Sequence, residues 1–230
     1  MKFVFFDIEC ANSYGNIGKM CSFGYVVTDE NFNVLTEPTD LLIDPAARFH
    51  WYVRDKILAY PVEDFLSQEK FPERYENIKN LLAGDVLAIG FDVKTDVLYL
   101  LDECFRNKLL PFSFKYFDVL KLSENYSPKC GGLKKAFLKW CDGVAEEKHK
   151  SSLDAYYTMR VFKSICEQTG FSAIELIQKH NDFCGETHDF KYGFYPNPLN
   201  EYKDKFKKKK KRKKVEAISP SDTVNTKSDT

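Results

Sequence analysis

The chain has 230 residues and a mass of 26.7 kDa, 43% of its residues are hydrophobic, and its formal net charge at pH 7 is zero. This length suits one domain with an appendage, the apolar content excludes disorder throughout, and no apolar stretch approaches the ~20 residues that a membrane-spanning helix needs. The first apolar run meets the charge of Asp7 too early for a signal peptide, and seven irregularly spaced cysteines disfavour a secreted disulfide framework. These features predict a protein of the reducing cytoplasm with no membrane partner.

The predicted elements alternate along the chain between strand-like and helix-like segments. Apolar runs and period-two alternation predict five strands, over residues 2–8, 22–28, 34–43, 85–89 and 112–117. Helical spacing of apolar residues predicts helices over 72–82, 93–107, 133–140, 152–168 and 172–179, the last with a capping box formed by Ser172 and Glu175. A three-strand meander followed by alternating helices and strands predicts an α/β fold with a mixed five-stranded sheet flanked by helices. This order is compatible with a ribonuclease H-like layout, though not unique to it.

The zero net charge conceals two parts of opposite sign. Residues 201–230 hold 11 Lys/Arg and 5 Asp/Glu, a net charge of +6, so residues 1–200 carry a net charge of −6. Residues 207–214 are continuous positive charge, and the residues after them are mostly polar. Such a composition cannot bury enough apolar surface to offset its ordering entropy. We therefore predict a folded body over 1–170, a C-terminal helical extension over 171–202 and a basic disordered tail over 203–230.

The basic tail allows three interpretations. Its lysines can contact nucleic-acid phosphates, with an affinity that falls steeply with salt. They can instead meet an anionic membrane surface, or they can simply keep the protein soluble. No aromatic or apolar stripe accompanies the run beyond Phe206, which weakens the membrane interpretation. Contact with nucleic acid and a tail without a binding function both stay open.

Two carboxylates stand at the end of the first predicted strand. Side chains alternate along a strand, so Asp7 and Glu9 point to the same face, with Phe3 and Phe5 before them. Two adjacent carboxylates repel each other, and burial makes this worse because each loses hydration. A hard divalent cation such as Mg²⁺ would remove the conflict. The alternative is a solvated strand end with two ordinary acids.

Two further acidic residues open the helix predicted over 93–107. If the strand before this helix runs beside the first strand, the helix begins near Asp7. Asp96 is then a candidate for the metal site, but it can also be an acid favoured by the helix macrodipole. Asp92 lies nearer the helix start and can be its N-cap. Position alone does not separate the two.

A histidine and an aspartate flank the start of the long helix near the end of the body. His149 lies in the loop before this helix, and Asp154 lies in its first turns. A loop histidine near a metal can act as a general base at neutral pH. Alternatively, Ser151 and Asp154 form a variant of a capping box, with His149 on the surface. We assign Asp118, which follows the last predicted strand, to the capping of the next segment.

The order of these residues resembles the DEDDh branch of the DEDD exonuclease superfamily, which contains proofreading subunits and RNase T. The resemblance covers about residues 3–168 and rests on three stretches: residues 3–9 with Asp7-Ile8-Glu9, residues 87–96 ending at Asp96, and residues 149–155 with His149-x4-Asp154. Members of the branch often read His-Asn-x-x-Phe-Asp in the middle stretch, where this chain has Phe91-Asp92-x-x-Thr95-Asp96. The substrate contacts of the missing His-Asn pair are therefore open, and Asp92 is a fallback for the role of Asp96.

The resemblance implies a ribonuclease H-like fold and a metal-dependent 3′–5′ exonuclease acting on the 3′ ends of single-stranded DNA or RNA, with DNA favoured. It implies two Mg²⁺ or Mn²⁺ ions, with Asp7 bridging both, Glu9 and Asp154 on the nucleophile side, and Asp96 positioning the second ion. His149 would take the proton from the attacking water. A polymerase or a repair protein is an implied partner. The alternatives are an RNase of the same superfamily and a non-catalytic accessory module that keeps the fold.

One other constellation invites a metal interpretation. His180-x3-Cys184-x3-His188 has helix-like spacing and soft ligands. Gly185 and the polar Asn181-Asp182 pair argue against a continuous helix there, and a fourth ligand is not evident. We therefore do not predict zinc at these residues.

Overall fold

A six-stranded sheet forms the centre of the computed structural model, which describes residues 1–12, 18–128 and 131–187. The strand order is β3-β2-β1-β4-β5-β6. The strands are β1 (Lys2–Cys10), β2 (Met20–Asp29), β3 (Val34–Leu42), β4 (Val86–Gly90), β5 (Lys115–Asp118) and β6 (Cys184–Glu186). Strands β1, β4 and β5 run parallel, and β2, β3 and β6 each pair antiparallel with a neighbour. The predicted basic tail lies outside the described residues.

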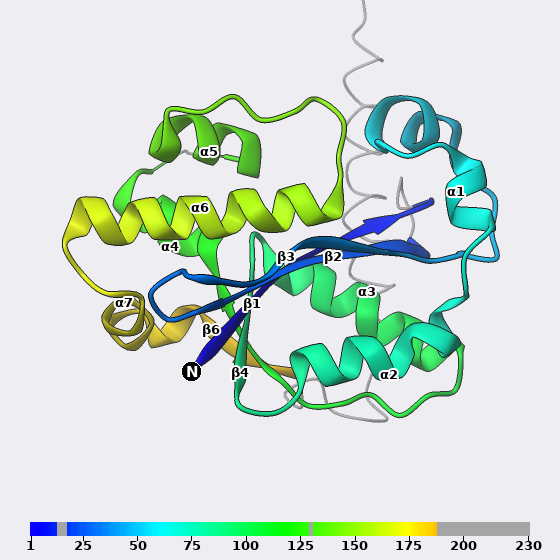
Figure 1. Cartoon of the computed structure of the whole chain (residues 1–230), viewed down its shortest axis with the longest axis horizontal. Helices are drawn as coiled ribbons and strands as arrows, with labels where there is room; N and C mark the ends of the chain where they lie inside the picture. Colours follow the sequence, from blue (N-terminus) through cyan, green and yellow to red (C-terminus); the bar gives the residue numbers. More distant parts are fainter. Residues whose placement is uncertain (13–17, 129–130, 188–230) are drawn as a thin grey trace, which may run out of the picture.

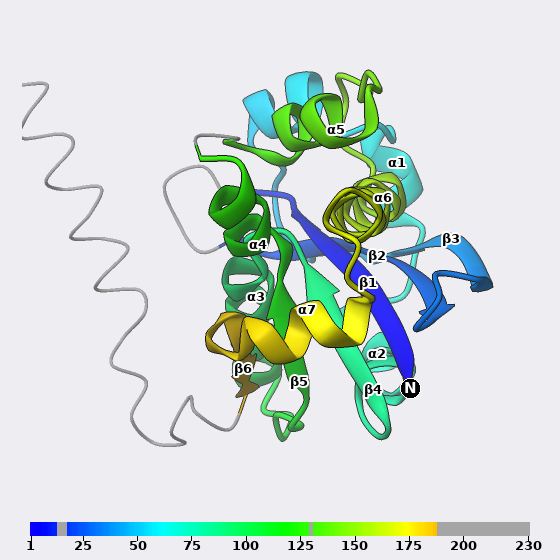
Figure 2. The same cartoon turned by 90° about the vertical axis from the view of Figure 1, so that its left-hand side faces the viewer.

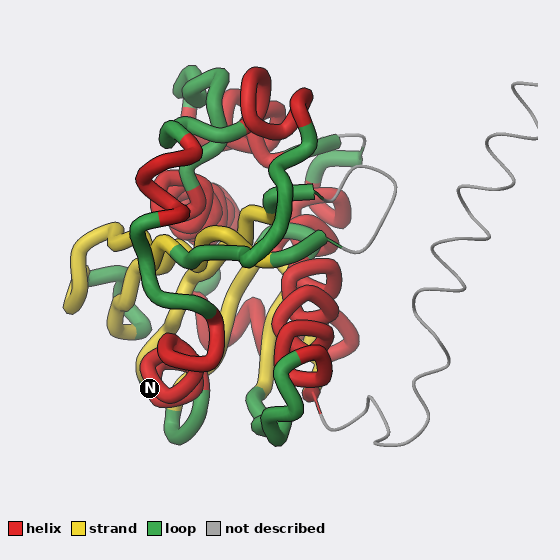
Figure 3. The backbone as a smooth tube through the Cα atoms, turned by 90° about the vertical axis from the view of Figure 1, so that its right-hand side faces the viewer, coloured by secondary structure: helices red, strands yellow, loops and turns green. Residues whose placement is uncertain are grey.

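Helices cover both faces of this sheet. They are α1 (Val62–Leu66), α2 (Phe71–Leu82), α3 (Val93–Arg106), α4 (Val119–Tyr126), α5 (Leu133–Cys141), α6 (Ser151–Thr169) and α7 (Ala173–Lys179), with short helical turns η1 (Val53–Ile57) and η2 (Asn181–Phe183). Figure 1 shows α5 and α6 above the sheet and α2 and α3 below it. Figure 2 shows α6 end-on against β1 and β2, and Figure 3 shows the strands with helices on both sides. None of the helices in the described ranges is long and apolar enough to cross a membrane.

The central strand β1 is apolar on both faces because both are covered. Phe3 and Phe5 pack in the core cluster that also contains residues of α6, whereas Val4 and Phe6 pack in the cluster with residues of α2 and α3. All four side chains are at most 1% exposed. A strand with both faces buried reads as a continuous apolar run, as this one does. The same alternation places Asp7 and Glu9 on the α6 face, at the carboxyl end of β1.

The structure confirms the predicted α/β fold but corrects the strand count from five to six. The additional strand β6 has three residues and pairs with β5, inside the segment predicted to be a helical extension. Gly185 lies in this strand because a Cβ there would be 2.3 Å from the ring of Tyr116. A three-residue strand with a central glycine has no recognisable strand propensity.

Two predicted helix caps are present. Ser172 and Glu175 form the capping box of α7. Asp118 caps α4, where its carboxylate accepts a hydrogen bond of 3.0 Å from the Leu120 amide. The helix that Asp118 caps was not assigned from the sequence, because it follows β5 without an intervening loop.

Candidate active site

The first two acidic groups come from the carboxyl end of β1. Asp7 and Glu9 are both partly buried, and both line a cavity of about 240 Å³. Burial raises the pKa of the Asp7 carboxyl well above its ordinary value, and the negative charges of Asp96 and Glu9 raise it further. Burial also raises the pKa of Glu9. The repulsion expected from the Asp-x-Glu spacing is therefore present in the folded chain.

Helix α3 brings Asp96 to these carboxylates. Strand β4 runs parallel to β1, with Phe5 opposite Ile89, so the helix that follows β4 begins beside the end of β1. Asp96 is 6% exposed and accepts a hydrogen bond from the backbone amide of Ile8, which lies between the two acids of β1. Burial and the charge of Glu9 raise the pKa of Asp96 well above its ordinary value.

The structure distinguishes Asp96 from Asp92 by burial. Asp92 also lines the cavity but is exposed, and it adopts a left-handed backbone conformation with φ 57°. It occupies the N-cap position of α3, yet its side chain makes no capping hydrogen bond. Its amide instead donates to the Asp118 carboxylate at 3.2 Å. Phe91 and Thr95, which stand where the DEDDh sequences that this chain resembles often have His and Phe, line the same cavity.

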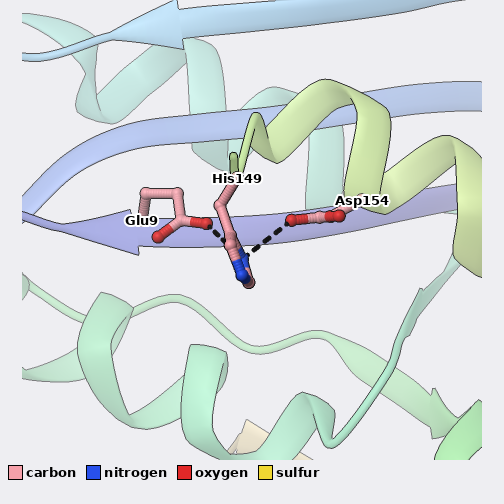
Figure 4. Close-up of side chains that lie close together, drawn as sticks. All are labelled: Glu9, His149 and Asp154. Atoms are coloured by element: carbon pink, nitrogen blue, oxygen red, sulfur yellow. Dashed lines mark ion pairs between the residues drawn. The ribbon is translucent and has the colours of Figure 1, made fainter. Parts of the chain in front are cut away.

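The side chain of His149 contacts acidic residues of both β1 and α6. Its Nδ1 lies 3.2 Å from Oε1 of Glu9 and 3.2 Å from Oδ2 of Asp154, as Figure 4 shows. The hydrogen bonds to Asp154 and to Glu9 raise the pKa of His149 to about 10. A protonated imidazole between the two carboxylates offsets part of their charge. The His149 side chain is 39% exposed, so the histidine lies at the surface and still contacts both carboxylates.

The first turn of α6 also differs from the capping-box alternative. Lys150, not Ser151, holds the N-cap position, and it makes no side-chain capping hydrogen bond. Ser151 lies inside the helix, where its hydroxyl donates to Asp40 of β3 at 2.8 Å and lies 2.5 Å from the hydroxyl of Ser22. Asp154, one turn on, is 6% exposed and faces His149.

The sequence analysis did not identify the residues that hold this turn in place. Asp40 was assigned to a strand and nothing more, although its side chain is only 6% exposed and accepts hydrogen bonds from Ser151 and Ser152. Gly24 was also missed: a Cβ there would lie 2.0 Å from the backbone of both serines. An Asp inside a predicted strand is a weak signal, and its partners Ser151 and Ser152 are more than a hundred residues away, so nothing local indicates these contacts.

The cavity suits a cation bound through oxygen atoms. Four acidic side chains line it, and none of the described lining residues is Lys or Arg. Within the described residues, ligand atoms of Glu9, His149 and Asp154 all lie within 4.8 Å of one another. Buried carboxylates with raised pKa values gain most when a hard divalent cation balances their charge. The residues present therefore fit a divalent metal ion.

The segment considered for zinc has a different role. His180 is 9% exposed, its Nε2 lies 3.2 Å from the Tyr126 hydroxyl, and its ring stacks on Phe183 at 5.1 Å. These contacts account for the buried histidine without a metal. His188, the third member of that spacing, lies outside the described residues.

Comparisons with known proteins show similarity of fold, but no match in sequence. Neither a protein-family model nor the sequence of a curated protein matches the chain. Among solved structures, E. coli exonuclease I in complex with a dA16 oligonucleotide is 19% identical with a TM-score of 0.61, covering 77% of this chain and 42% of that one. The zinc-bound form of the E. coli exonuclease I–ssDNA complex is 17% identical with a TM-score of 0.62, covering 78% of this chain and 43% of that one.

A shorter nuclease is similar over nearly its whole length. Exonuclease X in complex with 5′-overhanging duplex DNA is 13% identical with a TM-score of 0.55, covering 77% of this chain and 97% of that chain. The match to exonuclease I, in contrast, spans only about two fifths of that protein. The chain thus has the mixed α/β fold of these exonucleases, the ribonuclease H-like fold.

Proposed function

We propose that this protein is a metal-dependent 3′–5′ exonuclease that hydrolyses phosphodiester bonds at the 3′ end of a single strand, with DNA favoured. The observation that carries the proposal is His149, held between Glu9 and Asp154 at the cavity that Asp7 and Asp96 also approach. A general base, a set of buried carboxylates and an open cavity are the parts that phosphodiester hydrolysis needs. They stand on an exonuclease fold.

The carboxylates of Asp7, Glu9, Asp96 and Asp154 would hold two Mg²⁺ or Mn²⁺ ions. The negative charges of Asp96, Glu9 and Asp154 all act on Asp7, which supports Asp7 as the carboxylate that both ions would share. In this proposal, Glu9 and Asp154 would hold one ion and Asp96 would hold the other. Bound divalent ions supply a nucleophile at neutral pH and relieve charge on the leaving oxygen.

His149 takes the proton from the attacking water. The imidazole must be neutral to do so, whereas its hydrogen bonds to Asp154 and Glu9 raise its pKa to about 10 when no cation balances the two carboxylates. Once those carboxylates share their charge with a cation, they no longer stabilise the imidazolium, and the pKa of His149 falls towards the working pH. The same two contacts keep the ring facing the cavity.

Single-stranded DNA is the favoured substrate because the similar structures of exonuclease I hold dA16 and dT13 oligonucleotides. The 3′–5′ direction rests on the resemblance of the three sequence stretches to DEDDh exonucleases. The acidic body repels phosphate unless cations are bound, so binding and hydrolysis share one metal requirement. A polymerase or repair protein is the partner class that such an activity serves, and the cytoplasm is its expected place.

Digestion of end-labelled oligonucleotides tests the proposal. With Mg²⁺ or Mn²⁺, a 5′-labelled single strand should give a ladder that shortens from the 3′ end, and EDTA should abolish it. A circular single strand of the same composition should resist. Parallel DNA and RNA strands measure the sugar preference. Rapid cutting of the circle, or full activity in excess EDTA, would overturn the proposal.

A further inference from the structure

A short segment spans the flank of the active site from β1 to His149. At its start, the His50 amide donates a hydrogen bond of 2.9 Å to the carbonyl of Ala11, two residues beyond Glu9. At its end, the carbonyl of Ile57 accepts from the His149 amide at 2.7 Å, and the His149 carbonyl accepts from Ala59 at 3.0 Å. We call residues 50–58 the bridging segment, since both its ends are bonded to elements that carry active-site residues.

The inner side of the bridging segment is anchored. Val53 is 4% exposed and Leu58 is 2% exposed, and both pack in a small core cluster with Ala11, Cys21 and Phe65. This cluster is separate from the two large clusters on the faces of the sheet. In Figure 1 the segment forms the helical turn near α1, beside the loop that leads into α6. The backbone of the segment is therefore fixed relative to the cavity.

The outer side of the segment exposes two aromatic rings. Trp51 is 60% exposed and Tyr52 is 39% exposed. Their ring centroids lie 5.6 Å apart at an angle of 83°, and the ring of His50 lies 5.9 Å from Trp51. Large apolar side chains gain free energy from burial, so a Trp left mostly in water on an anchored segment has its apolar surface available to a ligand.

Basic residues lie on the same segment as the aromatic pair, although the body as a whole is acidic. Arg54 and Lys56 are exposed on the same segment, and Lys148 precedes His149. Arg54 pairs with Asp55, and the charges of Lys56 and Lys148 also act on this carboxylate, so Lys148 lies close to the segment. Aromatic rings beside positive charges are the combination that binds single strands, by stacking on bases and by contact with phosphates.

We propose that Trp51, supported by Tyr52, is a stacking subsite for one base of the single strand whose 3′ end enters the cavity, an inference that rests on the proposed function. The anchoring at Ala11 and His149 fixes the distance from the stacked base to the scissile bond. Stacking accepts every base, so the subsite contributes affinity and register rather than sequence preference. The ligand class is a nucleobase within a single strand of DNA or RNA.

The experiment compares Trp51→Ala, Trp51→Phe and a control, Phe105→Ala. Phe105 is 66% exposed and lies near the other end of α3, so its removal deletes a similar exposed ring away from the segment. Substrates are single-stranded oligonucleotides of increasing length and the p-nitrophenyl ester of thymidine 5′-monophosphate. The ester contains a single nucleotide and cannot reach the stacking subsite, so its hydrolysis reports on the catalytic groups alone.

We expect Trp51→Ala to raise KM for the longer oligonucleotides by about 5- to 100-fold, the range that stacking on one base supplies. Turnover at saturation and hydrolysis of the ester should stay near wild type, and Trp51→Phe should recover most of the affinity. In a second experiment, one abasic site is placed at successive positions counted from the 3′ end of the oligonucleotide. At one of these positions it should weaken binding to the wild-type protein but not to Trp51→Ala. Removing both the base and Trp51 should therefore weaken binding no more than removing either alone.

Two outcomes would contradict these expectations. If Trp51→Ala matches Phe105→Ala at every length and the abasic scan shows no position-specific loss, the subsite is refuted, while ester hydrolysis leaves the proposed function intact. The exposed pair would then be a contact for another protein, detectable as a change of oligomeric state in Trp51→Ala. If wild type hydrolyses neither the ester nor any oligonucleotide with Mg²⁺ or Mn²⁺, the proposed function fails and the subsite with it.

Discussion

The carboxylate of Asp40 accepts two hydrogen bonds from Ser152, one of 2.7 Å from its backbone amide and one of 2.6 Å from its hydroxyl. The same carboxylate accepts from Ser151 at 2.8 Å and from the hydroxyl of Tyr60 at 2.8 Å. These bonds join β3 to the first turn of α6, the turn between His149 and Asp154. The orientation of that turn decides whether His149 faces Glu9.

Replacing Asp40 should therefore disturb both stability and turnover. Asp40→Ala leaves several buried donors without an acceptor, at a cost of about 1–3 kcal/mol for each group left unsatisfied. We expect urea unfolding to show a loss of about 2–4 kcal/mol, the size typical of a broken buried charged network. The kcat should fall more than KM rises, because His149, the proposed general base, would be misplaced.

The exposed Asp64 provides the control for Asp40. Asp64→Ala should change stability by no more than about 0.5 kcal/mol. Asp40→Asn keeps one acceptor and should lie between wild type and Asp40→Ala. Unchanged stability and kcat in Asp40→Ala would show that α6 needs no tie to β3.

Gly24 should tolerate no side chain. Its Cβ would lie 2.0 Å from the backbone of Ser151 and Ser152, so Gly24→Ala must displace the start of α6 or bend β2. We expect a loss of stability of about 3 kcal/mol or more, beyond usual overpacking, because both contacted groups are backbone. Circular dichroism during thermal unfolding measures it. Gly132→Ala, which meets nothing within 4 Å, is the matched control, and equal effects of the two changes would contradict the close packing.

Without metal, the protein should lose stability as the pH rises. Asp7 and Asp96 have pKa values well above those of free carboxyls, so the folded chain binds protons more tightly than the unfolded chain. Their contribution is fully present below the ordinary carboxyl pKa and is lost as pH rises through the raised values. His149 acts in the same direction, because its contribution is complete below its unfolded pKa of about 6.5 and is lost through about 10.

Melting temperatures in EDTA between pH 5 and pH 9 test this dependence. Mg²⁺ should raise the melting temperature, by the equivalent of about 2.7 kcal/mol at a hundred times its dissociation constant. The gain should grow with pH, because the cation and protons compete for the same carboxylates. Asp7→Asn removes one charge and should reduce both the pH slope and the response to Mg²⁺. A melting temperature that ignores Mg²⁺ at every pH would contradict a metal site here.

Substitutions at His149 and Asp154 should distinguish the proposed general base from a proposed metal ligand. His149→Ala should keep the response of the melting temperature to metal and lose activity by about 10²- to 10⁴-fold, the usual worth of a general base. Its pH–rate profile should also lose the limb that imidazole produces. Asp154→Ala should lose activity and tight metal binding together.

The neighbouring Lys148 gives the control for His149. Lys148→Ala removes a positive charge from the same loop and should keep the shape of the pH–rate profile. Should His149→Ala remain near wild type over pH 6–9, the histidine is not the base, and its contacts with Glu9 and Asp154 serve structure alone.

Removal of the basic tail should change salt dependence more than catalysis. Truncation after Tyr202 removes 11 Lys/Arg and 4 Asp/Glu, a net charge of +7 counted from the sequence. If its lysines contact phosphates, the truncated protein should bind long strands more weakly at low salt and should converge with the full chain as salt rises. Turnover of saturating short oligonucleotides should hardly change. Identical salt slopes with and without the tail would show that the lysines do not touch the substrate.

Local sequence patterns determined most of the strands and helices and the position of Asp7 and Glu9. Period-two alternation placed Asp7 and Glu9 on one face of β1, and the structure keeps them there, because alternation is a property of the strand itself. The capping box of α7 was likewise readable, since its two residues lie three positions apart. The resemblance to DEDDh exonucleases added the order in which Asp96, His149 and Asp154 follow.

Tertiary structure alone decided how these groups meet. The choice of Asp96 over Asp92 depends on which side chain reaches the Ile8 amide, and the orientation of His149 depends on Asp40, whose bonds to Ser152 join residues 112 positions apart. The close approach at Gly24, the sixth strand and the anchoring of residues 50–58 are of the same kind. Propensity and periodicity act over a few neighbouring residues, whereas these contacts form only when distant segments pack, so no stretch of sequence contains them.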